Sequence, residues 1–297
     1  MTSLLAATRT TEFASRVVGV RTFLPQISAK RFSTVGGIAE GVFVQQIDSC
    51  KSFNDTRWTE HWIALANEHL KHLDNEFEKA ELGSSHALLR GLPPSPALIS
   101  FLGRGAAAMT QTPPGTPIDK DTFPQDGQKG SFIAVNALLE AIACFFVAAW
   151  PGQTPARLKA YRVWEALFDV LLDVIAPTLS LNVESETTVS GVLVINGLEG
   201  TNVETVVTAL RTKAVLSSAW FFMEMPGTYA YKQPLTKSSS KLIYNEVLTF
   251  MALHKLVDGS RLGMFGISFE GNCATRVAMV DKRLKVVFSW SMERRIR

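Results

Sequence analysis

The chain has little cysteine and little excess charge. Its 297 residues include three cysteines, Cys50, Cys144 and Cys273, which are far apart and show no CxxC or Cys/His spacing. This argues against a disulfide framework or a zinc site and favours a reducing compartment. The formal charge of +3 arises from 30 basic and 27 acidic residues that alternate along the chain. The charge pattern therefore does not indicate a nucleic-acid partner.

Acidic residues are also scarce in residues 1–37, where Glu12 stands alone against five basic residues. This basic segment, rich in Ser, Thr and Ala, has the composition of a mitochondrial presequence. A basic N-terminal helix of a cytosolic protein has the same composition. We expect a cytoplasmic protein, with mitochondrial import as the alternative.

Residues 38–180 are expected to form a helical region. Residues 54–82 repeat apolar side chains at helical spacing, with Asn54 or Asp55 as the cap, and residues 155–175 show a second broad apolar face. His69 and His72 share one face of the first helix, but no carboxylate or cysteine completes a ligand set, so we expect solvated histidines and no metal.

Residues 132–150 form an apolar run about as long as a membrane-spanning helix. Asn136 and Glu140 lie inside it, and a charge at mid-span is costly in a bilayer. We therefore predict a buried helix and no membrane partner.

Residues 91–130 are dense in Pro, Gly, Thr and Gln and have no sustained period. They are predicted as an irregular insertion in the helical region. A linker, a lid and an erroneous gene model remain open as explanations.

In residues 181–297 short apolar runs alternate with helical segments, which predicts a parallel sheet. The expected strands are residues 191–195, 219–225, 261–265 and 284–289, and the expected helices are residues 203–217, 239–256 and 269–280. Ligands of such sheets bind beyond the carboxyl ends of the strands.

The main chemical signal is Ser268, in the sequence RLGMFGISFEGNCATRVAMV. An apolar strand runs into Gly-Ile-Ser and directly into a helix, which is the context of a nucleophile turn in an α/β-hydrolase sheet. The backbone N–H of Phe269 would then point at a developing oxyanion. Glu270 replaces the usual glycine of this turn, so we expect bulk and charge near the nucleophile, with Gly271 relieving part of the crowding.

A second signal is the glycine-containing loop NGLEGT after the expected strand 191–195. In α/β-hydrolases a loop after an early strand supplies the other oxyanion donor, so the N–H of Leu198 is the candidate. An ordinary strand-to-helix turn would also have this composition.

The order and spacing of NGLEGT, FFMEMPGTYAYKQPLTKSSSKLIYNEVL and VDGSRLGMFGISFEGNCATRVAMVDKRLKVVFSW resemble the α/β-hydrolases grouped with the bacterial fermentation-respiration switch protein. They are also similar to fungal hydrolases of the fusarin and melanin polyketide pathways. The resemblance implies an incomplete α/β-hydrolase core over residues 181–297 and a helical cap region over residues 38–180. It also implies Ser268 as nucleophile, with Leu198 and Phe269 as oxyanion donors.

The triad acid and histidine have no match. In this fold they follow the serine along the chain, whereas all five histidines, the last being His254, precede Ser268. Asp281 comes too early to be the acid. The expectation is a C-terminally truncated chain whose last strand leaves an unprotected sheet edge.

Two functions stay open at this stage. One is a serine hydrolase of fungal secondary metabolism acting on an ester, thioester or C–C bond next to a carbonyl, with a polyketide-like substrate. The other is a truncated, catalytically inactive family member or incomplete gene product. Neither requires a cofactor, and a homo-oligomer is compatible with both.

Overall fold

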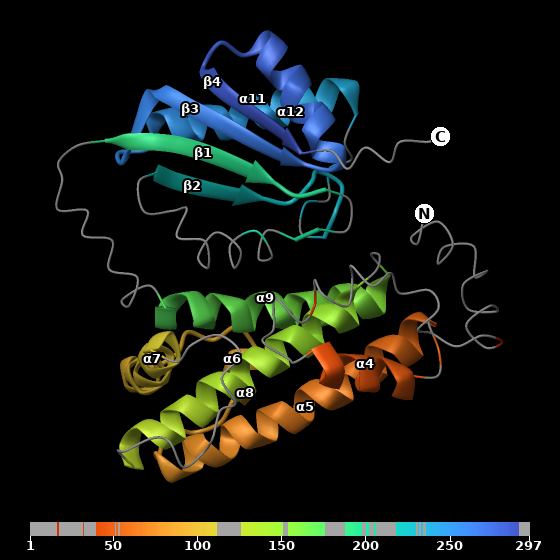
Figure 1. The fold of residues 1–297 in the computed structure, drawn as a ribbon, viewed down its shortest axis with the longest axis vertical. Helices are drawn as coiled ribbons and strands as arrows, with labels where there is room; N and C mark the ends of the chain where they lie inside the picture. Colours follow the sequence, from red (N-terminus) through yellow and green to blue (C-terminus); the bar gives the residue numbers. More distant parts are fainter. Residues whose placement is uncertain are drawn as a thin grey trace. The chain divides into compact units, whose positions relative to one another are not determined.

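The computed structural model describes residues 17, 32, 40–50, 52, 54–111, 126–150, 154–175, 188–197, 200, 201, 205, 218–229, 231, 233 and 236–290. The chain divides into two compact units, Met1–Ser180 and Leu181–Arg297. The first is helical and the second contains a sheet, as Figure 1 shows. Of the basic N-terminal segment, Val17 and Phe32 are described.

The helical unit contains α4 (Glu40–Ser49), α5 (Asp55–Lys79), α6 (His86–Leu89), α7 (Pro96–Gln111), α8 (Asp126–Ala149) and α9 (Pro155–Ile175). Helix α5 begins where predicted, because the side chain of Asn54 accepts hydrogen bonds from the backbone N–H groups of Thr56 and Arg57. Such a cap typically contributes about 1 kcal/mol.

Aromatic side chains fill the core of this unit. Phe146 of α8 stacks on Trp164 of α9 with ring centroids 5.1 Å apart, and the indole of Trp58 on α5 donates to the carbonyl of Val147 at 2.8 Å. Phe32 is 1% exposed and packs edge-on against Phe146. This part of the N-terminal segment therefore belongs to the packed core in the structure.

Helix α8 is apolar on all sides. The stretch Gln128–Ala149 is long and apolar enough to cross a membrane by length and composition, and 78% of its most apolar window is buried inside the structure. Such burial is typical of the central helix of a bundle. Glu140 is accommodated because its carboxylate lies 2.8 Å from Nδ1 of His69 on α5. The sequence expectation of a solvated His69 is therefore wrong, since the side chain is 20% exposed and paired.

The prediction of an irregular insertion over residues 91–130 is wrong where α7 forms and where α8 begins. Residues 112–125 lie outside the described residues. Within α7, Gly105 has a packing role. A β-carbon on Gly105 would lie 2.2 Å from the carbonyl oxygen of Ser131 on α8. The backbones of α7 and α8 therefore approach each other closely at this glycine.

The α/β unit contains β1 (Val189–Ile195), β2 (Ser218–Met223), α11 (Lys237–Leu253), β3 (Val257–Ile267), α12 (Phe269–Val280) and β4 (Leu284–Trp290). The sheet is parallel throughout, in the order β2-β1-β3-β4. This confirms the predicted α/β fold class. Each predicted strand is present, but β3 begins four residues earlier than the apolar run, and residues 206–217 of the first expected helix lie outside the described residues.

Strand β1 is central and its last three residues are buried, as expected for a strand covered on both faces. The core of the unit joins Leu193 and Ile195 of β1 to Tyr244 and Leu248 of α11 and to Ala274 of α12. Strand β4 forms one margin of the sheet and pairs with β3. Five of its seven residues are exposed, among them Phe288 at 61%.

The close contact at Gly105 generates a stability prediction. Gly105→Ala places a methyl group against the backbone of α8 and should lower the free energy of unfolding by about 1–3 kcal/mol. Gly103→Ala on the same helix is the matched control, because the nearest atom to its added carbon is 4.0 Å away. It should be neutral or stabilising by up to about 1 kcal/mol through helix propensity. Urea unfolding of both variants measures the difference, and equal effects would contradict the packing role.

Candidate active site

Ser268 lies between the last residue of β3, Ile267, and the first residue of α12, Phe269. Its backbone has φ 57° and ψ −119°, a conformation that glycine adopts readily and other residues rarely. A positive φ at a serine costs of the order of 1–3 kcal/mol and persists where the surroundings enforce it. The strain is located at the residue that the sequence identifies as the nucleophile.

Three glycines make room for this turn. A β-carbon on Gly266 would lie 2.3 Å from the carbonyl oxygen of Glu270, and one on Gly271 would lie 2.5 Å from Oγ of Ser289 on β4. One on Gly197, which follows β1, would lie 2.7 Å from the β-carbon of Ser268 and 3.2 Å from its Oγ. Residues at the ends of β1, β3 and β4 and at the start of α12 therefore pack closely around the turn that carries Ser268.

A backbone hydrogen bond fixes the turn from the other side. The N–H of Ser268 donates to the carbonyl of Trp290, at the end of β4, over 2.7 Å. The carbonyl of Ser268 accepts from the N–H of Gly271 at 3.1 Å. The turn is therefore held by β4 and by the first turn of α12.

Phe269 is the first residue of α12, so its N–H belongs to the group at a helix start that has no acceptor within the helix. Such N–H groups stabilise negative charge. This position is consistent with its predicted role as an oxyanion donor. Leu198, the other predicted donor, lies outside the described residues, but its neighbour Gly197 directly adjoins Ser268.

The side chain of Glu270, which the sequence predicts to bring bulk and charge near Ser268, is hydrogen-bonded to α11. Its residue is fully buried, and the hydroxyl of Tyr244 on α11 donates to Oε2 over 2.5 Å. Burial raises the pKa of Glu270 above its ordinary value, despite the hydrogen bonds from Tyr244 and Cys273. Burial also raises the pKa of the neighbouring Cys273 thiol to about 11. Burial between α11 and α12 thus favours the uncharged form of this carboxyl group more than water does.

Polar residues also follow β1 and β2 at the same edge of the sheet. The amide of Asn196 donates to the carbonyl of Thr201 at 2.6 Å and so closes the loop that follows β1. Glu224, the first residue after β2, is 5% exposed. No role was predicted for either residue from the sequence. Both are polar residues directly after a buried strand, and that position is the signal that could have identified them.

The histidine and the two aspartates of the described α/β unit lie toward the other edge of the sheet. His254 ends α11 three residues before β3 begins, and its Nδ1 accepts from the N–H of Leu256. Asp258 is near the start of β3, and Asp281 ends α12. Because β3 is 11 residues long, its two ends are roughly 30 Å apart at the usual rise per residue. None of these side chains reaches Ser268.

Asp258 and Asp281 have local structural partners. Asp258 accepts from the hydroxyl and N–H of Ser260 and from Arg261, which lowers the pKa of its carboxyl group to about 2. Asp281 forms an ion pair with Arg283, whose guanidinium likewise lowers the pKa of Asp281. Within the described part of the chain, no group of three or more His, Cys, Asp or Glu side chains could hold a metal ion.

Comparison with known proteins supports the fold. No protein-family profile matches the chain, and no curated protein matches it in sequence. Among solved structures, 2,6-dihydroxy-pseudo-oxynicotine hydrolase is similar, with a TM-score of 0.52 and 16% identity, over 86% of this chain and 62% of that protein. The sheet and its helices thus resemble α/β-hydrolase structures.

Two structures of AbyA5 are also similar. One has a TM-score of 0.49 and 17% identity over 89% of this chain and 62% of that one. The other has a TM-score of 0.42 and 22% identity over 51% of this chain and 49% of that one. The chain therefore spans less than two thirds of the length of each of these solved structures.

The buried Glu270 gives a pH prediction. Because burial raises its pKa in the folded state, its contribution to stability is complete below the ordinary value of 4.5 and is lost as the pH rises through the raised pKa. Glu270→Gln cannot ionise, so its unfolding free energy should fall less than that of the unchanged protein between pH 4.5 and pH 8. Chemical denaturation across this range tests it. Parallel curves for the two proteins would show that folding does not raise the pKa of Glu270.

Proposed function

We propose that this chain carries the nucleophile and oxyanion site of a serine hydrolase of the α/β-hydrolase type. The observation that carries the proposal is the backbone of Ser268, with φ 57° between a strand end and a helix start. This is the geometry of a nucleophile elbow, in which a strained turn presents the hydroxyl at the top of the sheet.

The chemistry supported by this geometry is attack on a carbonyl carbon. Oγ of Ser268 would form the new bond, and the N–H groups of Phe269 and Leu198 would donate to the oxygen as it becomes negative. A base must accept the hydroxyl proton. Neither His254 nor Asp281 is close enough to Ser268 for this role, so a complete cycle needs a group beyond those described.

The substrate class is the finer part of the proposal. An ester, thioester or C–C bond next to a carbonyl would suit a serine nucleophile and an oxyanion site. A polyketide-like molecule of fungal secondary metabolism is proposed on the resemblance of the NGLEGT, MPGT and GISFEG segments to fungal hydrolases, and on that resemblance alone.

A second candidate is a chain that keeps the elbow without catalysing turnover. The observation that favours it is the placement of His254, Asp258 and Asp281 at the edge of the sheet away from Ser268. Losing the general base from a serine triad lowers the rate by several orders of magnitude. Such a chain would retain the fold and bind a ligand without efficient hydrolysis.

Covalent labelling distinguishes the two candidates. A fluorophosphonate probe should label the purified chain at Ser268, and Ser268→Ala should abolish the label, because the elbow presents the hydroxyl and the oxyanion donors stabilise the negative charge that develops on the probe. Ser260→Ala is the matched control. It replaces an exposed serine near the start of the same strand and should leave labelling unchanged.

Intact mass and peptide mapping give the readout, with circular dichroism confirming that each variant is folded. Folded protein that takes up no label would contradict the catalytic proposal and favour the second candidate. Equal labelling of the unchanged chain and Ser268→Ala would place the reactive group elsewhere.

A further inference from the structure

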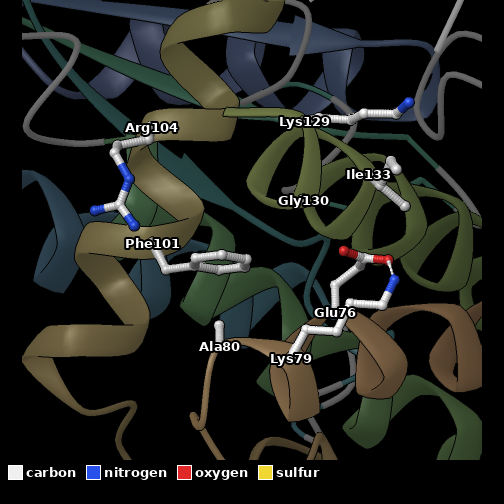
Figure 2. Close-up of a pocket in the computed structure, with 8 residues that line it drawn as sticks. All are labelled: Glu76, Lys79, Ala80, Phe101, Arg104, Lys129, Gly130 and Ile133. Carbon is white, nitrogen blue, oxygen red and sulfur yellow. Dashed lines mark hydrogen bonds and ion pairs between the residues drawn. The ribbon is translucent and has the colours of Figure 1, made fainter. Parts of the chain in front are cut away.

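The helical unit contains a cavity of about 400 Å³ to which no function has been assigned. It lies among the C-terminal end of α5, the middle of α7 and the start of α8 (Figure 2). The residues that line it are Glu76, Lys79, Ala80, Phe101, Arg104, Lys129, Gly130 and Ile133. This volume lies in the range of small-molecule sites.

An aromatic ring and a guanidinium group adjoin each other on one wall. The guanidinium carbon of Arg104 is 5.7 Å from the ring centroid of Phe101, and its Nη1 donates to the hydroxyl of Ser100 at 3.3 Å. No carboxylate among the described residues forms an ion pair with Arg104. The wall therefore combines a largely buried aromatic ring, 7% exposed, with an exposed cation whose charge is not balanced by a described acid.

The opposite wall carries an ion pair between a carboxylate and an ammonium group. Oε1 of Glu76 lies 2.5 Å from Nζ of Lys79, and the Glu76 side chain is 10% exposed. Figure 2 shows this pair facing the Phe101 ring, with the Lys129 ammonium directed away from the centre. Because Glu76 is neutralised by Lys79, Arg104 supplies the cationic character of the cavity.

Gly130 keeps the space between these walls open. A β-carbon at this position would lie 3.0 Å from Oε2 of Glu76 and 3.9 Å from the Phe101 ring. A larger side chain would project into the cavity. The absence of a side chain at this point in α8 therefore preserves room beside the ring.

We propose that this cavity binds a small aromatic monocarboxylate. The ring of the ligand would pack against Phe101 and Ile133, and its carboxylate would accept hydrogen bonds from Arg104, a group suited to carboxylates by its fork of donors. A phosphate fits less well. It carries more charge than one guanidinium balances, and it has no apolar part for the ring.

Titration calorimetry with the full chain tests the proposal, with 1-naphthylacetate as the probe. We expect saturable binding that weakens at least tenfold for the neutral 1-naphthylacetamide and at least tenfold in Arg104→Gln, the usual scale for losing a charge-assisted hydrogen bond. Gly130→Leu should also abolish binding, because the side chain fills the cavity.

Arg57→Gln is the matched control. It removes the same charge from an exposed site on α5, 19 residues before Glu76, which is roughly 28 Å along the helix. It should change affinity less than twofold. Circular dichroism verifies that each variant is folded.

No binding of 1-naphthylacetate to the folded chain, or equal losses in Arg104→Gln and Arg57→Gln, would overturn the proposal. If inorganic phosphate binds tightly and the naphthyl group adds no affinity, the proposal of an aromatic ligand is overturned. The outcome is independent of the hydrolase proposal, because Ser268→Ala, whose substitution lies in the other unit of the chain, should bind the probe unchanged.

Discussion

The α/β unit depends on a steric constraint at the end of β3. The chain reverses from strand to helix at Ser268 while backbone from β1 and β4 lies against the turn, and this is feasible because Gly197, Gly266 and Gly271 have no side chains there. The hydrogen bond from Ser268 to Trp290 adds β4 to the same arrangement. The position of the serine hydroxyl is therefore set by contacts among four separate elements.

The turn is also coupled to the core behind it through Glu270. Its carboxyl group lies between α11 and α12, where it accepts a hydrogen bond from Tyr244 and where burial raises the pKa of both groups. A buried neutral acid with a hydrogen-bond partner is far less costly than a buried charge. The residue that departs from the usual elbow pattern thus serves the packing of α11 against α12.

Much of the sheet could be predicted from sequence. Short apolar runs alternate with helical segments over residues 191–290, and this pattern is local in the sequence. Helix α7 could not be predicted, because Gly105 is interpretable only through its contact with Ser131. The hydrogen bond of Glu270 could not be predicted either, because its partner Tyr244 is 26 residues away in the sequence. The turn at Ser268 could be predicted because the strand, turn and helix that form it are contiguous in sequence.

At Ser268, the strained backbone lowers the stability of the fold, while the side chain supplies a hydroxyl group. Glycine would adopt φ 57° without penalty and relieve strain of the order of 1–3 kcal/mol. It would also remove the hydroxyl around which the four elements converge. Glycine at this position would therefore favour stability, whereas serine retains a hydroxyl at the end of β3 in a strained backbone.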